Sequence, residues 1–175
     1  PAKAFDELGL VIHCGSFSKS LAPGYRIGWV IAGRYQERIR RDKLMTTLSA
    51  SVPAQLAIAD YISRGGYDRH LRRLRHFLED QQALMTSAIA SHFPAGTKVT
   101  RPRGGYFLWL ELPSNIDSLA LYHACLAKGI NLAPGPIFSA TEDYGNCIRL
   151  NYGQPLGQIT SAVEAVGKIA RGLNQ

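Results

Sequence analysis

The chain has 175 residues, 46% of them hydrophobic, and 20 Lys and Arg against 13 Asp and Glu give a net charge of +7. No apolar run approaches the roughly 18 residues of a membrane span, so we expect no membrane-spanning helix. Cys14, Cys125 and Cys147 are odd in number, far apart and outside any zinc-binding spacing. This pattern excludes a disulfide framework and predicts reduced core cysteines and no metal site. No signal-like segment opens the sequence, so the expected location is the cytoplasm.

Two short apolar runs lie near the start of the chain, at residues 10–14 and 27–32. Both are rich in residues that favour β-structure, and glycine bounds each of them. These features predict two buried strands joined by a loop.

The predicted loop concentrates polar donors, namely Ser16, Ser18, Lys19 and Arg26. An anion such as a phosphate favours hydroxyl donors and a bidentate guanidinium. The plain alternative is a solvated lysine on a turn and an arginine at a strand edge. We favour an anion site built around Lys19, because the whole string of serines, lysine and arginine is hard to obtain by chance.

Helical and strand patterns alternate through the rest of the chain. Residues 67–91 have apolar residues at mostly helical spacing, which predicts a long helix. We predict helices at 34–49, 53–64, 67–91, 117–128 and 156–173, and strands at 98–100, 106–112, 130–133 and 147–152. This order indicates an α/β fold.

Basic side chains gather on two of the predicted helices. The first carries Arg34, Arg38, Arg40, Arg41 and Lys43, and the long helix carries Arg69, Arg72, Arg73 and His76 at i, i+3, i+4 and i+7. Such a stripe can meet phosphates, but we favour a solvated helix face, or one that pairs with acidic residues elsewhere in a longer protein.

Arg149 lies in a predicted strand whose neighbours are apolar, where an unpaired charge is costly. Arg149 therefore requires an anion, either a bound ligand or an acidic side chain in a buried ion pair. Upstream, Tyr106 follows the pair Gly104-Gly105, which lets the backbone turn tightly, although such a glycine pair is more often a simple strand entry.

The motif Ser-x-Ser-Lys ending at Lys19, followed by Pro-Gly-x-Arg-x-Gly, resembles the cofactor-lysine signature of fold type I aminotransferases, which depend on pyridoxal 5'-phosphate (PLP). The resemblance implies that catalytic Lys19 holds PLP as an imine and that Ser16, Ser18 and Arg26 bind its phosphate. It also implies that Arg149 clamps the α-carboxylate of the substrate, with Tyr106 as a second substrate-binding residue.

Enzymes of this fold have roughly 400 residues with the lysine past the middle, so the chain resembles a C-terminal fragment. The implied fold class is the α/β C-terminal part of a PLP-dependent transferase. Residues 1–80 are then the end of the large PLP-binding domain, and residues 81–175 the small domain. The family's glycine-rich phosphate turn, ring-stacking aromatic residue and pyridine-binding aspartate are missing, so we expect the chain alone to be inactive.

Within that family, the segment from Gly15 to Trp29, together with Gly104-Gly105 and Ala133-Pro134-Gly135, resembles MocR-type regulators of the GntR family. The resemblance implies a PLP-binding effector domain that forms a homodimer and reaches DNA through a domain outside this chain. Its ligand is expected to be an amino acid or a 2-oxo acid. The alternative is a catalytic aminotransferase similar to the 2-aminoadipate or kynurenine type.

Overall fold

The computed structural model describes residues 1–141, 143–154 and 156–174. The chain divides into two compact units, Pro1–Arg73 and Leu74–Gln175, which we describe separately. The helix α3 (Gly66–His92) begins in the first unit and ends in the second. The predicted boundary near residue 80 stays a prediction about the domains of the whole protein.

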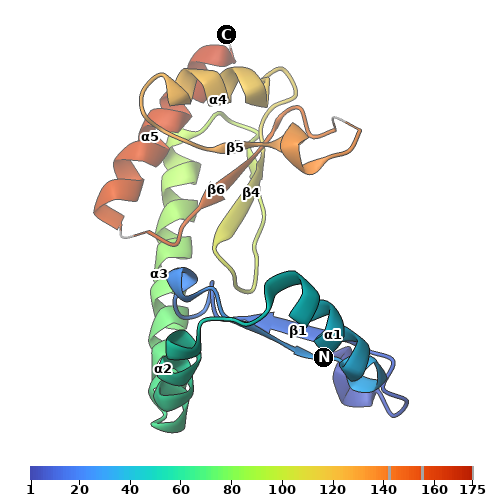
Figure 1. The fold of residues 1–175 in the computed structure, drawn as a ribbon. Helices are drawn as coiled ribbons and strands as arrows, with labels where there is room; N and C mark the ends of the chain where they lie inside the picture. The colour runs from blue at the N-terminus through green and yellow to red at the C-terminus, as the bar shows by residue number, and fades with distance from the viewer. Residues whose placement is uncertain (142, 155, 175) are drawn as a thin grey trace. The chain divides into compact units, whose positions relative to one another are not determined.

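The first unit is built on a two-stranded antiparallel sheet of β1 (His13–Ser16) and β2 (Gly28–Ile31), visible in Figure 1. The chain then forms α1 (Gln36–Thr47) and α2 (Val52–Ser63). The predicted loop between the strands is confirmed, and it contains the short helix η2 (Pro23–Tyr25). Two further short helices are η1 (Ala2–Phe5) and η3 (Gly33–Tyr35).

The expectation that both strands are buried is wrong for this chain. Ile12, Trp29 and Ile31 are 46%, 41% and 50% exposed, and only Ile27 and Ala32 of these two runs are buried. A two-stranded sheet covers neither of its faces, so apolar side chains on it stay open unless another layer packs there. Cys14 is likewise exposed, contrary to the prediction of a core cysteine, whereas Cys125 and Cys147 are buried as predicted.

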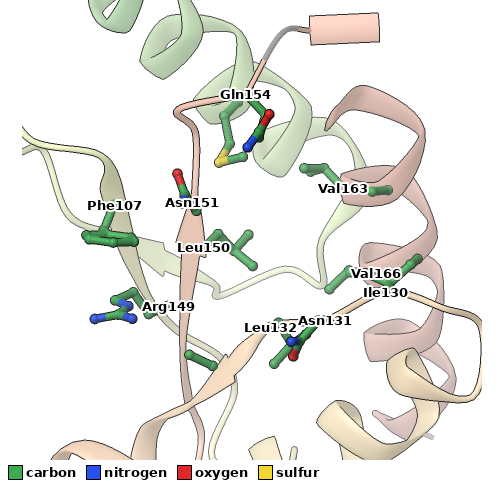
Figure 2. A pocket seen from close by; sticks show the side chains of 13 residues that line it. Phe107, Ile130, Asn131, Leu132, Arg149, Leu150, Asn151, Gln154, Val163 and Val166 are labelled. Carbon is green, nitrogen blue, oxygen red and sulfur yellow. The ribbon is translucent and has the colours of Figure 1, made fainter. Parts of the chain in front are cut away.

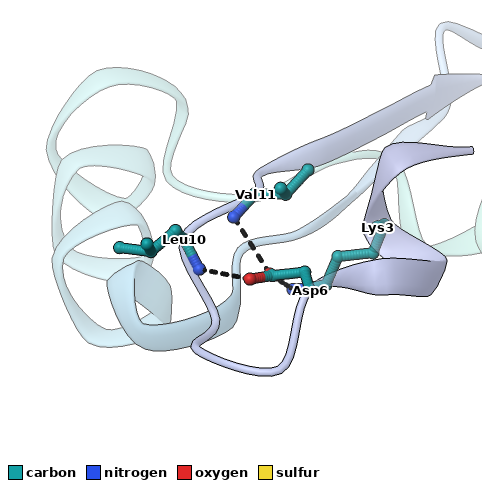
Figure 3. Close-up of polar contacts among 4 residues, drawn as sticks. All are labelled: Lys3, Asp6, Leu10 and Val11. Carbon is teal, nitrogen blue, oxygen red and sulfur yellow. Dashed lines mark hydrogen bonds and ion pairs between the residues drawn. The ribbon is translucent and has the colours of Figure 1, made fainter.

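A carboxylate holds the turn that leads into β1 (Figure 3). Asp6 accepts hydrogen bonds from the Lys3 amine at 2.7 Å and from the backbone N–H groups of Leu10 and Val11 at 2.8 and 3.0 Å. The Lys3 hydrogen bond, aided by the two backbone donors, lowers the pKa of Asp6 to about 2. The ionised form of Asp6 therefore stabilises this turn.

The second unit contains a four-stranded antiparallel sheet with strand order β3-β4-β6-β5. The two central strands are β4 (Phe107–Glu111) and β6 (Cys147–Asn151), and Trp109 of β4 lies opposite Arg149 of β6. The other elements of this unit are β3 (Lys98–Val99), β5 (Ala133–Pro134), η4 (Gly135–Phe138), α4 (Ser118–Leu126) and α5 (Leu156–Leu173).

One face of this sheet carries the main core. Alternate residues of the central strands, Leu108, Leu110, Ile148 and Leu150, are 9% exposed or less. Buried residues of all three helices complete this core: Met85 and Ile89 of α3, Leu121 and Cys125 of α4, and Val163, Val166 and Ala170 of α5. The period of two along the strands places the intervening side chains, Arg149 among them, on the other face.

Most predicted elements are confirmed within two residues at their ends. Asp117 caps α4 by accepting from the N–H groups of Leu119 and Ala120, as an aspartate at that position predicts. The strand expected at 130–133 is instead the short β5, because Ile130 and Asn131 line a pocket rather than pair with β6.

No helix in the described part of the chain is both long and apolar enough to cross a membrane. Among the described residues, no three His, Cys, Asp or Glu side chains gather as a metal site.

Candidate cofactor and carboxylate sites

The loop between β1 and β2 is a closed turn. The Phe17 N–H donates to the Ile27 carbonyl at 3.0 Å, and the Phe17 carbonyl accepts from Leu21 and Ala22 at 2.9 and 3.0 Å. Phe17 and Leu21 also pack against the small core of the first unit, which Ile27 forms with two residues of α2. The backbone of the loop is therefore fixed from within, and its polar side chains are held in place.

Three of the predicted phosphate-binding side chains lie together in this loop. The Ser16 hydroxyl accepts from the Ser18 N–H at 3.1 Å, and Arg26 donates through Nη1 to the Ser18 hydroxyl at 3.2 Å. Arg26 also donates to the Pro23 carbonyl at 3.5 Å. Two hydroxyls and a guanidinium thus converge, and these are the donors that a phosphate dianion accepts from best.

Arg26 has a left-handed backbone conformation with φ of 54°. This region is uncommon for residues other than glycine, asparagine and aspartate, and its backbone strain is often associated with functional sites. Lys19 directly follows Ser18 and is exposed. The structure therefore places all four predicted cofactor residues in a single turn of the first unit.

Two supporting residues were not predicted from the sequence. Tyr67 of α3 donates from its hydroxyl to the Ser20 hydroxyl at 2.9 Å, and its ring meets the Phe17 ring edge-on at 5.7 Å. These contacts fix the loop directly after Lys19. The hydrogen bond joins positions 47 residues apart, and no local sequence pattern signals such a pair.

Each strand of the β1–β2 pair has a glycine at a position where a side chain would collide with the other strand. A Cβ atom on Gly15 would overlap the indole of Trp29, and one on Gly28 would lie 2.8 Å from the Gly15 carbonyl oxygen. Gly28 lies opposite Ser16 in the sheet register. The absence of side chains at these positions lets the strands approach closely next to the donor cluster.

The second unit contains a pocket of about 480 Å³ between β6, α5 and the segment that leads into β5 (Figure 2). Arg149 and Asn151 of β6 are among the residues that border it. Met85, Leu132 and Val166 are among the apolar residues that line it. The pocket lining is mostly apolar, and the Arg149 guanidinium lies on the other side of β6 from Leu150 and Val163 (Figure 2).

Arg149 is half-buried and is held by aromatic rings. Its guanidinium carbon lies 4.2 Å from the centre of the Phe107 ring and 4.5 Å from the centre of the Phe138 ring. Figure 2 shows Phe107 and Arg149 next to each other on one side of β6. Among the residues that the structure describes, no carboxylate forms an ion pair with Arg149.

Tyr106 lies at the entry of β4, after Gly105, whose φ of 99° favours glycine. The Tyr106 carbonyl accepts from the Tyr152 N–H at 2.9 Å, and burial raises the pKa of the Tyr106 hydroxyl. Its ring lies so close to Gly153 that a Cβ there would come within 2.7 Å. Among the described residues it does not line the pocket that contains Arg149.

Comparisons with known proteins identify the family. The family model described as aminotransferase class I and II matches residues 2–166. The HTH-type transcriptional regulator YdcR of Escherichia coli is 45% identical over 97% of this chain and 36% of its own length. The aromatic-amino-acid aminotransferase 1 of Thermococcus litoralis is 37% identical over 87% of this chain and 37% of its own length.

Solved structures agree with this fold. The Pyrococcus horikoshii kynurenine aminotransferase, crystallised in complex with PMP, is 32% identical and superposes with a TM-score of 0.89. That match covers 99% of this chain and 43% of the enzyme. The chain therefore belongs to the aminotransferase class I and II family. It has the α/β fold of the C-terminal part of these enzymes. It spans only about a third of the length of the curated relatives that it matches.

Family membership implies PLP as the cofactor. The described residues fit its phosphate, because Ser16, Ser18 and Arg26 present converging donors and Lys19 lies in the same turn. When bound, PLP supplies the electron sink for amino-acid chemistry.

Proposed function

We propose that this chain is the C-terminal part of the PLP-binding effector and dimerisation domain of a MocR-type regulator in the GntR family. The observation that carries the regulator assignment is the 45% identity to the regulator YdcR over 97% of the chain. The whole protein then reaches DNA through a domain outside this chain, forms a homodimer and works in the cytoplasm, where a regulator meets the chromosome.

In this proposal the cofactor lies on the turn of the first unit. Ser16, Ser18 and Arg26 bind the phosphate, and the Lys19 amine carries the cofactor covalently. The hydrogen bond from Arg26 to Ser18 supports this assignment, because it holds the guanidinium beside a hydroxyl donor.

Arg149 is proposed to bind the carboxylate of an amino acid or a 2-oxo acid. Its support is that Arg149 borders the pocket and that its guanidinium has no ion-pair partner among the described residues. Tyr106 is proposed as a second ligand-binding residue, supported by its place beside Gly153, two residues after the Asn151 that lines the same pocket.

A catalytic aminotransferase is the second candidate, and the 37% identity to the Thermococcus litoralis enzyme favours it. The test uses the whole protein. A regulator binds promoter DNA at fixed salt, changes that binding when PLP and an amino acid are added, and shows no multiple turnover with an amino acid and a 2-oxo acid. Multiple-turnover transamination without promoter binding overturns the regulator assignment in favour of the enzyme.

A further inference from the structure

Two phenyl rings from different elements contact the guanidinium of Arg149. Phe107 comes from β4 and lies 4.2 Å from the guanidinium carbon, and Phe138 comes from η4 and lies at 4.5 Å. Both distances fall within the roughly 6 Å over which a cation is attracted to the face of a ring. The positive charge of Arg149 is therefore stabilised by aromatic faces.

The way in which a guanidinium binds a ring decides which of its groups stay available. The group is planar, and its five N–H donors lie in the plane while its two faces stack on aromatic rings. When aromatic rings contact the faces of a guanidinium, the N–H donors at its edge stay available for other partners. Within the described part of the chain, no hydrogen bond from Arg149 is present to occupy them.

The rings themselves are fixed by further contacts. Trp109, opposite Arg149 in the sheet register, meets Phe138 edge-on at 5.6 Å and Tyr144 edge-on at 5.5 Å. Phe107 is held by its place in β4, opposite Asn151. Arg149 thus lies in a frame of aromatic side chains.

An acidic partner would act differently from these rings. A carboxylate of the protein would occupy the guanidinium fork and compete with the carboxylate of a ligand, whereas a ring stabilises the charge without taking a donor. We propose that Phe107 and Phe138 are positioning residues that orient Arg149 to bind the carboxylate of an amino acid or a 2-oxo acid. This inference rests on the ligand-binding role of Arg149 proposed above.

The test replaces each ring in the whole, PLP-loaded protein by an aliphatic side chain, in Phe107→Leu and Phe138→Leu. Binding of L-phenylalanine and of 2-phenylethylamine, which lacks the carboxylate, is measured by calorimetry. We expect each variant to bind L-phenylalanine about 3- to 10-fold more weakly, as the loss of one cation–π contact predicts, and to bind the amine unchanged. Phe107→Tyr and Phe138→Tyr keep a ring and should restore the affinity.

Two control variants distinguish failure of the proposed carboxylate site from failure of the positioning role. Ile137→Val alters the same short helix as Phe138 but removes no ring from Arg149, and it should bind both compounds as the wild type does. Arg149→Ala should lose affinity for L-phenylalanine more severely than either ring variant. If Arg149→Ala binds it normally, or the wild type does not bind it at all, the proposed carboxylate site and this inference both fall.

If Arg149→Ala loses affinity while both leucine variants keep it, only the positioning role is overturned. An equal loss for the acid and the amine also overturns it, because a general disturbance of the pocket would explain both. A crystal structure of ligand-free Phe107→Leu gives a readout that needs no ligand. The proposal expects the Arg149 guanidinium to leave its wild-type orientation, and an unchanged, well-ordered guanidinium contradicts it.

Discussion

Lys19 is the residue on which the proposed cofactor site depends. Its position in a turn closed by backbone hydrogen bonds means that its side chain contributes little to packing. We therefore expect the chemical role of Lys19 to be separable from the fold.

In the whole protein, Lys19→Ala is expected to abolish covalent attachment of PLP while changing the free energy of unfolding by less than about 1 kcal/mol. Borohydride reduction followed by mass spectrometry measures the attachment, and denaturant unfolding measures stability. Ser16→Ala is the matched control, since it removes one phosphate donor and keeps the amine. Equal trapping of cofactor in Lys19→Ala and the wild type shows that another residue carries it.

Asp6 gives a pH-dependent prediction at the same scale. Its pKa falls from an ordinary 3.8 to about 2, chiefly through the Lys3 hydrogen bond. A lowered folded-state pKa means that the stabilisation is complete above about pH 4 and is lost as the pH falls towards 2. The difference in unfolding free energy between wild type and Asp6→Asn should shrink over this window, as measured by denaturant titration at several pH values. A difference that stays constant with pH contradicts the prediction.

Individual residues also show where sequence reasoning was sufficient. The donor loop was predictable because its serines, lysine and arginine are close in the chain, and a turn between two strands must bring them together. The Tyr67–Ser20 contact was not predictable, because it depends on how α3 packs against the loop. The aromatic frame of Arg149 was missed for the same reason, since Phe107 and Phe138 lie far from it in sequence.

At the scale of elements, the β1–β2 pair shows how glycine sets the spacing of the cofactor loop. Gly28→Ala would place a Cβ 2.8 Å from a backbone oxygen that cannot move independently. We expect it to destabilise the strand pair by about 1–3 kcal/mol and to weaken PLP binding. Gly24→Ala lies in the same loop with open space around it and ordinary φ, so it is the control. Equal stability of the two variants in thermal unfolding would refute this account.

Helices were predicted more accurately than strands. α5 has the predicted bounds, Leu156–Leu173, and α4 begins at its predicted aspartate cap, because helix hydrogen bonds and caps are local. β5 differs from its prediction, since a strand exists only where a partner pairs with it. The prediction that residues 10–14 and 27–32 are buried was wrong, because burial of a strand pair depends on other elements that pack against its faces.

For the molecule as a whole, many large apolar side chains of the first unit are exposed. No residue of α1 is buried, and Met45 and Leu48 are 83% and 74% exposed. Phe5 and Leu8, in the same unit, are 86% and 73% exposed. Exposed side chains of this size associate with other apolar surfaces in water.

We therefore expect the isolated 175-residue chain to self-associate, to bind PLP weakly and to show no transamination. Light scattering coupled to gel filtration measures the association, and absorbance titration measures PLP affinity. The double variant Met45→Glu with Leu48→Lys should reduce self-association without altering the cofactor loop. A monodisperse monomer, or micromolar PLP affinity of the isolated chain, is the outcome that opposes this expectation.

The chain's two tryptophans fall one in each unit, and each lies beside a proposed site. Trp29 packs over Gly15 and lies 4.9 Å from the ring of His13, next to the strand end that carries Ser16. Trp109 contacts Phe138 and Tyr144 in the frame around Arg149. Single-tryptophan variants of this chain thus provide two separate fluorescent reporters, so the emission of one follows events at the cofactor loop while the other follows events at the carboxylate site.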